Sequence, residues 1–274
     1  KRQAVRNPSN PEEIVGHVSL ASEKQLDQAL SNAYAMNFTW TNTPLETRAA
    51  SLERAADRFE QRFGEFMALV IKEGGKTLPD AVAEVREAID FCRYYALRAR
   101  KDLIPQHLPG PTGEENWLRF PGRGVIACIS PWNFPLAIFI GQVTAALVAG
   151  NTVIAKPASQ TPCVATEAVK LLHEVGIPVD ALQLLPARGS VIGPKITDDP
   201  RIKGIIFTGS TETAREINQR LAHREGGILP FIAETGGQNA MIVDTSALKE
   251  QVVVDVLISA FGSAGQRCSA LRVL

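Results

Sequence analysis

The N-terminal apolar positions predict short strands followed by a long helix. The first twenty residues contain a turn cluster at Asn7–Pro11 and then apolar positions such as Ile14 and Val18, which predict one or two short strands. Ser22–Gln25 has the capping-box pattern that opens a helix, and we expect this helix to run toward Phe38.

Helical spacing of apolar residues continues to about residue 100. Thr43–Glu46 is a second capping-box pattern, with proline at the first helical position. Apolar residues then recur at alternating spacings of four and three, which predicts one long amphipathic helix whose stripe is Leu45, Ala49, Leu52, Ala56, Phe59 and Phe63. Gly74 and Gly75 end the next helix, and Pro79 opens a third that runs to about Arg100. We interpret these helices as a packing layer.

Residues 101–124 are rich in proline and glycine, which predicts a loop region. Asn116–Phe120 supplies one candidate strand within it. We expect this region to form an arm that reaches a neighbouring subunit.

From Gly124 the pattern changes to short apolar runs separated by helical segments. Val125–Ile129 is wholly apolar, as strands buried on both faces of a parallel sheet are. The strands predicted after it are 152–155, 182–185, 204–207, 229–233 and 240–243, and the helices are 136–148, 161–175, 190–197, 212–223 and 248–261. This alternation predicts an α/β fold, with a Rossmann-like parallel sheet, helices on both of its faces and the N-terminal helical layer before it.

Composition excludes several classes of function. The chain is 45% hydrophobic and 21% charged with no net charge, which is typical of a globular protein and does not favour a nucleic-acid or membrane partner. The longest apolar run, residues 135–150, is interrupted by Gln142 and Thr144 and is too short to span a bilayer. The four cysteines have no metal-ligand spacing, so we predict no metal site and a reducing, cytoplasmic environment.

Polar residues follow four of the predicted strands, where ligands bind in a parallel sheet. The segments are 130–135, 156–159, 208–212 and 234–239. One such loop would be ordinary turn chemistry. Four loops with distinct reactive or anion-binding groups on one sheet edge are difficult to explain by folding needs.

The chemistry of these loops is mutually consistent. Thr208, Gly209 and Ser210 at a helix start offer backbone N–H groups and a hydroxyl to a phosphate, and Lys156 can bind ribose hydroxyls or add positive charge beside a pyrophosphate. Asn133 can donate an amide N–H to a developing oxyanion. Glu234, beside two glycines, can act as a general base toward water. Together these groups favour a bound dinucleotide. No GxGxxG fingerprint follows the first strand, so this interpretation depends on the strand-end loops alone.

Cys268 is the candidate nucleophile, in a segment of small residues. The neighbouring Arg267 would favour the thiolate form. Taken alone, Cys268 is better interpreted as a buried structural cysteine near a helix end. The strand-end loops favour the nucleophile.

Five motifs in order resemble those of the aldehyde dehydrogenase superfamily: 131–134 (PWNF), 156–158 (KPA), 207–211 (FTGST), 234–237 (ETGG) and 265–268 (GQRC). The resemblance covers nearly the whole chain. Within the superfamily, 110–114 (GPTGE), 232–241 (IAETGGQNAM) and 263–271 (SAGQRCSAL) look like the L-glutamate γ-semialdehyde (1-pyrroline-5-carboxylate) dehydrogenase module of bifunctional proline utilization A proteins.

The resemblance implies a covalent mechanism. Cys268 would attack the aldehyde carbon to give a thiohemiacetal, whose oxyanion the Asn133 amide and the Cys268 backbone N–H would hold. Hydride would pass to the nicotinamide of NAD⁺, and Glu234 would activate water to hydrolyse the thioester.

The resemblance also assigns binding residues. The cofactor-binding set would be Ile129, Trp132, Lys156, Ser159, Gly189, Gly193, Thr208, Gly209, Ser210 and Gly236. Arg267, Ser269, Phe134 and Glu87 would contact the substrate. Many NAD-preferring relatives carry glutamate where Ser159 stands, so NAD is expected while NADP stays open.

The family's pattern extends beyond this chain. Residues 1–260 would be an NAD-binding domain with its N-terminal helices, and 261–274 the start of a catalytic domain. We therefore expect a longer polypeptide, a homo-oligomer, and a fragment that is inactive alone. A preceding proline dehydrogenase domain would bring FAD, and the parent protein could then associate peripherally with a membrane.

Two other functions stay open. The chain could belong to another NAD(P)-dependent enzyme, such as a succinate semialdehyde dehydrogenase. It could also be a non-catalytic nucleotide-binding module if the polypeptide is this short.

Overall fold

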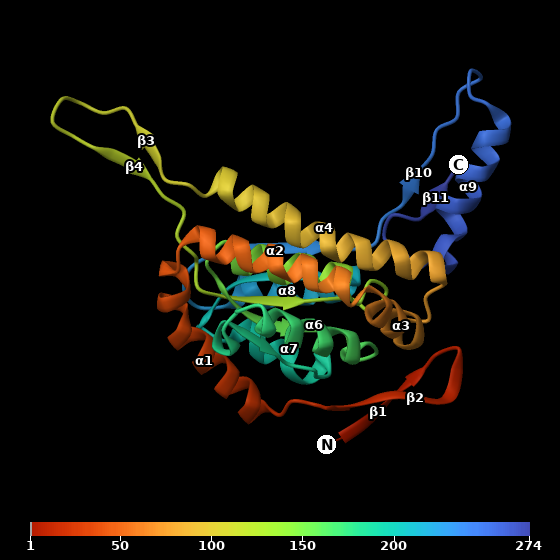
Figure 1. The fold of residues 1–274 in the computed structure, drawn as a ribbon, viewed down its shortest axis with the longest axis horizontal. Coiled ribbons are helices and arrows are strands. Elements are labelled where there is room, and N and C mark those ends of the chain that lie inside the picture. The colour runs from red at the N-terminus through yellow and green to blue at the C-terminus, as the bar shows by residue number, and fades with distance from the viewer. Residues whose placement is uncertain (1) are drawn as a thin grey trace.

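A five-stranded parallel sheet of order β7-β6-β5-β8-β9 forms the centre of the chain (Figure 1). The computed structural model describes residues 2–274. The strands are β5 (Val125–Ile129), β6 (Thr152–Lys156), β7 (Leu182–Leu184), β8 (Ile202–Thr208) and β9 (Phe231–Glu234). Every residue of β5 and β6 is buried, which explains why these sequences are apolar without alternation.

Helices cover both faces of the sheet, and alternate residues of β5 point into two separate cores. Ile126 and Cys128 face the larger core, which the helices α2 (Leu45–Gln61), α3 (Phe63–Gly74), α4 (Leu78–Asp102), α5 (Ala137–Val148) and α6 (Pro162–Glu174) complete. Val125 and Ala127 face the second core, which is completed by α1 (Glu23–Asn42), α7 (Gly189–Asp198) and α8 (Thr211–His223). The predicted α/β class with an N-terminal helical layer is confirmed.

Three small two-stranded sheets lie outside the central one. Near the N-terminus β1 (Arg2–Asn7) and β2 (Asn10–Ser19) pair antiparallel, as do β3 (Gln106–Leu108) and β4 (Asn116–Leu118). The short strands β10 (Asn239–Ala240) and β11 (Leu271–Val273) pair in parallel beside α9 (Lys249–Phe261). Figure 1 shows the β3–β4 hairpin and the α9 region projecting from opposite ends of the molecule. Short 3₁₀ turns, η1 (Val179–Ala181) and η2 (Gly262–Gly265), complete the elements.

The capping signals are confirmed at the first helix and wrong at the second. Ser22 caps α1 with the reciprocal Gln25 contact that the sequence predicts. At α2 the N-cap is Pro44, which makes no side-chain hydrogen bond. The Thr43 hydroxyl instead donates to the carbonyl of Thr39 at 3.0 Å, because Thr43 is the C-cap of α1 and serves that helix.

The amphipathic helix predicted from Leu45 and the next helix ending at Gly74 are confirmed, and only Phe63, the last residue of the predicted stripe, belongs to the second of them. Arg62 leaves helical geometry at φ −100° and ψ 22°, so α2 ends at Gln61 and Phe63 begins α3. The kink lets the Arg62 side chain lie between Glu65 at 2.6 Å and Glu167 of α6 at 3.5 Å. Gly75 then ends α3 in the left-handed conformation, with φ 66°.

The predicted strand 240–243 is wrong as a member of the central sheet. Only Asn239–Ala240 is a strand, and it pairs with β11. The Asn239 side chain donates to the carbonyls of Cys268 at 2.7 Å and Ala270 at 3.0 Å, so the chain turns toward β11. The predicted domain boundary at residue 260 stays a prediction.

Within the predicted loop region 101–124, the structure has a β3–β4 hairpin that projects from the molecule (Figure 1). Its strand at 116–118 pairs with β3, and the side chain of Trp117 is 48% exposed. Contact of this arm with a neighbouring subunit stays a prediction.

Candidate active site

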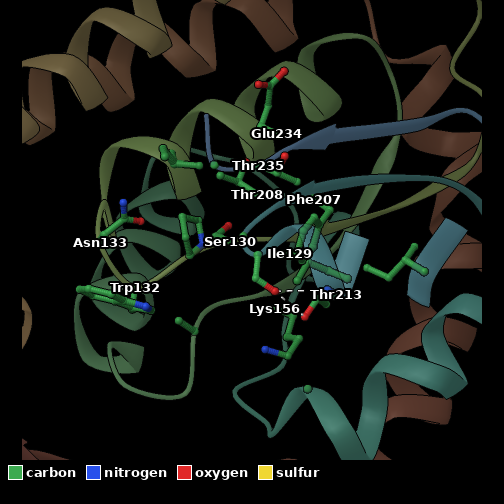
Figure 2. Close-up of a pocket in the computed structure, with 18 of the residues that line it drawn as sticks. Ile129, Ser130, Trp132, Asn133, Lys156, Phe207, Thr208, Thr213, Glu234 and Thr235 are labelled. Atoms are coloured by element: carbon green, nitrogen blue, oxygen red, sulfur yellow. Dashed lines mark hydrogen bonds between the residues drawn. The ribbon is translucent and has the colours of Figure 1, made fainter. Parts of the chain in front are cut away.

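A pocket of about 940 Å³ lies at the carboxyl ends of β5 and β8, where the strand order changes direction. Figure 2 shows Glu234 and Thr235 at the top of this pocket, Trp132 and Asn133 at its left, and Lys156 below its centre. The lining includes all residues that the sequence analysis assigns to catalysis or cofactor binding: Ile129, Trp132, Asn133, Lys156, Ser159, Gly189, Gly193, Thr208, Gly209, Ser210, Glu234, Gly236 and Cys268. Of the predicted substrate residues, only Arg267 lines it.

Asn133 lies in the loop between β5 and α5, held between Pro131 and Pro135. Its side-chain amide donates a 2.9 Å hydrogen bond to the backbone carbonyl of Gln266. An asparagine amide carries two N–H donors, so this bond leaves one donor for a ligand. The loop is therefore fixed to the segment that carries Cys268.

Gln142 of α5 joins the ends of two strands beneath the pocket. Its amide oxygen accepts from the Ser130 hydroxyl at 2.8 Å, and its amide nitrogen donates to the Thr208 hydroxyl at 2.9 Å and to the Ile129 carbonyl at 3.3 Å. Gln142 is not among the site residues predicted from the sequence. The available signal was a lone amide in a helix that is otherwise almost wholly apolar.

Lys156 ends β6 with its side chain almost fully buried. The ammonium donates to the carbonyl of Pro157 at 3.0 Å, and burial lowers the pKa of Lys156 to about 8. Nearby Gly189 begins α7, and a β-carbon built there would lie 3.9 Å from the Lys156 side chain. Ser159 is exposed on the pocket wall.

The β8–α8 turn presents a helix N-terminus to the pocket. Ser210 is the N-cap of α8, and its hydroxyl accepts from the Thr213 N–H at 3.2 Å. The Gly209 N–H donates to the carbonyl of Glu234 at 3.1 Å, which joins this turn to the end of β9. A β-carbon at Gly209 would lie 2.6 Å from the Phe207 ring, so the turn requires glycine. Free N–H groups and a positive dipole end make this turn suitable for a phosphate.

Glu234 ends β9, and its side chain is exposed at the side of the pocket opposite Lys156 (Figure 2). A side chain at Gly236 would meet no atom within 4 Å. The Glu234 side chain is thus accessible to solvent at the end of a strand, as a base that must reach water requires.

Cys268 is exposed, unlike the other three cysteines. Burial raises the pKa of Cys92 and of Cys163 to about 12, and raises that of Cys128 further. These three thiols therefore stay protonated near neutral pH. Cys268 alone is both accessible and inside the pocket.

The pocket lining contains one of the four predicted substrate residues. The Arg267 guanidinium donates to the carbonyls of Ile258 at 2.8 Å and Ser259 at 2.7 Å, so here it caps the end of α9. Phe134, Ser269 and Glu87 lie outside the pocket lining. Partial burial raises the pKa of the Glu87 carboxyl, while Lys76 opposes that shift.

Strand order and pocket position define a doubly wound α/β protein with its ligand site at the switch point. The model of the Aldehyde dehydrogenase family matches residues 1–274, and the chain belongs to this family.

The chain is similar to proteins named for proline catabolism. It is 52% identical to the bifunctional protein PutA of Klebsiella aerogenes, over 99% of this chain and 20% of that protein. It is 41% identical to a 1-pyrroline-5-carboxylate dehydrogenase of Bacillus mycoides, over 96% of this chain and 52% of that protein. A solved 1-pyrroline-5-carboxylate dehydrogenase from Thermus with bound NAD matches with a TM-score of 0.95 at 36% identity, covering 99% of this chain and 53% of that one.

The chain thus spans about a fifth of the bifunctional relative and about half of the shorter ones. Between residues 2 and 274, none of the helices has the length and apolar character needed to cross a membrane.

Proposed function

We propose that the complete polypeptide oxidises L-glutamate γ-semialdehyde to L-glutamate with NAD⁺ as the hydride acceptor. The observation that carries this proposal is the meeting of Cys268, Asn133 and Glu234 in one pocket with a helix N-terminus and Lys156. Similarity to proteins named PutA and 1-pyrroline-5-carboxylate dehydrogenase supports the choice of aldehyde.

The residues of the pocket fit a dinucleotide. The N-terminus of α8 faces the pocket and suits the pyrophosphate, with Thr208, Gly209 and Ser210 around it. Lys156 and Ser159 would face the ribose near Gly189 and Gly193 of α7, and Ile129, Trp132 and Gly236 would line the remaining wall. Bound NAD⁺ would supply the acceptor for the hydride that leaves the substrate carbon.

The reaction then has two steps, oxidation of the aldehyde to a thioester on Cys268 and hydrolysis of that thioester. The Cys268 thiolate adds to the aldehyde carbon, and the new oxyanion accepts hydrogen bonds from the free Asn133 N–H and the Cys268 backbone N–H. Loss of hydride leaves a thioester on Cys268. Glu234 takes a proton from water, which attacks that thioester and releases the carboxylate product and the Cys268 sulfur.

The decisive experiment is NADH formation by the complete protein with L-glutamate γ-semialdehyde. We expect Cys268→Ala to lower kcat by at least about 10³-fold, because a covalent nucleophile has no substitute in this pocket. Cys163→Ala is the matched control, since Cys163 lies outside the pocket, and it should retain activity. An active Cys268→Ala variant would overturn the covalent mechanism.

Substrate and cofactor choice are separate tests. A higher kcat/KM for succinate semialdehyde than for glutamate semialdehyde would favour the alternative substrate, and Arg267, Ser269, Phe134 and Glu87 are the residues to vary. Ser159 places no carboxylate beside the ribose, so the ratio of kcat/KM values for NAD⁺ and NADP⁺ should rise in Ser159→Glu.

The relatives named bifunctional protein PutA also support a longer assembly. In that arrangement a proline dehydrogenase domain with FAD precedes this chain, and the exposed β3–β4 hairpin contacts a second copy. If the complete protein keeps the same oligomeric state in solution after residues 106–118 are removed, this role of the hairpin is contradicted.

A further inference from the structure

Lys76 lies in the connection between α3 and α4, in the layer that the sequence predicts to serve packing alone. Its side chain is only 5% exposed, so the ammonium is removed from water. A buried cation is stable only when neighbouring groups compensate its charge. Lys76 is not part of the pocket lining. Any influence on catalysis must therefore pass through the groups that it contacts.

Those groups belong to three different segments. The Lys76 nitrogen lies 3.7 Å from Oε2 of Glu84 in α4, and 4.2 Å from the ring centroid of Phe134. It also donates to the hydroxyl of Ser263 at 3.3 Å. Phe134 directly follows Asn133, and Ser263 lies in the turn before Cys268. In Figure 1 the α3–α4 connection lies on the same side of the molecule as α9 and the segment after it.

Glu84 extends this contact to the start of α5. Its other oxygen accepts from the N–H of Leu136 at 2.9 Å, which fixes the end of the Asn133 loop. The side chain is fully buried. Burial raises the pKa of Glu84 to about 7, and the Lys76 cation opposes that shift. Within residues 2–274 Oε2 of Glu84 has no hydrogen-bond partner, so Lys76 is the group that balances it.

Ser263 needs such support because its backbone is strained. Ser263 and Ala264 have φ values of 53° and 54°, in the left-handed region that residues with a β-carbon seldom adopt. The Ser263 carbonyl accepts from the Gln266 N–H at 3.0 Å, and the Gln266 carbonyl in turn accepts from Asn133. The strained turn therefore sets the path of the chain toward Cys268.

We propose that Lys76 is a positioning residue that holds the Asn133 loop and the Cys268 loop in a fixed relation. It acts on Asn133 through Phe134 and through Glu84, and on Cys268 through Ser263. The inference rests on the proposed function, because it assigns Lys76 to the alignment of the oxyanion donor with the nucleophile.

The kinetic test uses the complete protein. Lys76→Met should lower kcat by about 10²-fold, the usual effect of a small misplacement of reacting groups, while KM for NAD⁺ changes by less than about twofold. Ser263→Ala should cause a smaller loss. Because Ser263→Ala removes only the contact with Lys76, which Lys76→Met already removes, the double variant should be no slower than Lys76→Met. Lys72→Met is the matched control, since Lys72 forms an exposed ion pair with Glu13, and it should keep the wild-type rate.

Hydrogen–deuterium exchange provides a readout that needs no activity. We expect Lys76→Met to speed exchange in both 132–137 and 262–268, whereas a purely structural lysine would affect only α3 and α4. A wild-type kcat in folded Lys76→Met, or faster exchange confined to α3 and α4, overturns the proposal. If Lys76→Met does not fold, Ser263→Ala decides through the same two measurements. If the wild-type protein forms no NADH, the proposed function fails, while the exchange pattern still decides whether Lys76 connects the loops.

Discussion

The side-chain amide of Asn133 donates a 2.9 Å hydrogen bond to the backbone carbonyl of Gln266, across 133 positions of sequence. Gln266 lies two residues before Cys268, so the candidate oxyanion donor holds the chain that carries the candidate nucleophile. One N–H of the amide orients the loop and the other stays available. The candidate oxyanion donor therefore also helps to fix the loop that carries the candidate nucleophile.

Asn133→Ala should lower kcat by about 10²–10³-fold, because it removes a donor to the oxyanion. The variant also loses the bond to Gln266, so KM for the aldehyde should rise as well. Steady-state NADH formation measures both constants. Asn42→Ala removes an exposed amide on α1 and should behave as wild type. A wild-type kcat for Asn133→Ala would exclude this side chain as the donor.

Glu234→Gln should separate the two halves of the reaction. Hydride transfer does not need the base, whereas hydrolysis of the thioester does, so the variant should form a burst of NADH close to one per site and then turn over slowly. Rapid-quench mass spectrometry should show the acyl group on Cys268. Glu12→Gln, an exposed carboxylate in the N-terminal hairpin, should give no burst beyond wild type. Equal slowing of both phases would argue against this role.

Lys156 should make NAD⁺ binding depend on pH. Its pKa of about 8 means that the cation present at pH 7 is lost as the pH rises through 8. Because the cofactor is anionic, its dissociation constant should increase from pH 7 to pH 9.5, by at most about tenfold per pH unit for one proton. Calorimetric titration of wild type and Lys156→Met tests this. The variant should bind weakly, with little change over the same range, and an equal slope in both proteins would be the contrary result.

Gly122→Ala should destabilise the fold. A β-carbon there would lie 2.2 Å from the backbone carbonyl oxygen of Gly150, which cannot move without displacing the start of β6. We expect a loss of about 1–3 kcal/mol or more in the free energy of unfolding. Gly64→Ala in α3 meets no atom within 4 Å and should stabilise by up to about 1 kcal/mol. Urea unfolding of the complete protein compares the two, and equal midpoints would contradict the steric argument.

The sequence was most informative where local signals and burial agree. The apolar runs of β5 and β6 predicted strands because both faces are buried, and polar residues at the strand ends identified one sheet edge. The sequence alone therefore predicts that Asn133, Lys156 and Glu234 share one pocket. The prediction of a strand at residues 240–243 was wrong. The strand β10 pairs with β11, which lies about thirty residues later in the chain, and local propensity does not encode such long-range pairing.

The buried polar groups were the harder part to predict. Glu84 lies in α4, whose apolar stripe indicates packing, and Lys76 lies in the connection before that helix. Only the burial of these two side chains shows that they need partners. Gln142 has the same character on α5. A charged residue on an amphipathic helix is usually solvated, so spacing alone could not distinguish these side chains from surface ones.

Cys268 follows all five central strands and all four strand-end loops in the order of the chain. A ribosome adds about 5–20 residues per second, so β9 is completed roughly 2–7 s before Cys268 is added and β5 roughly 7–28 s before it. The nascent chain therefore contains the candidate phosphate-binding edge before it contains the candidate nucleophile. The late position of Cys268 in the sequence thus shortens the time for which the proposed nucleophile is exposed on the ribosome before the rest of its site exists.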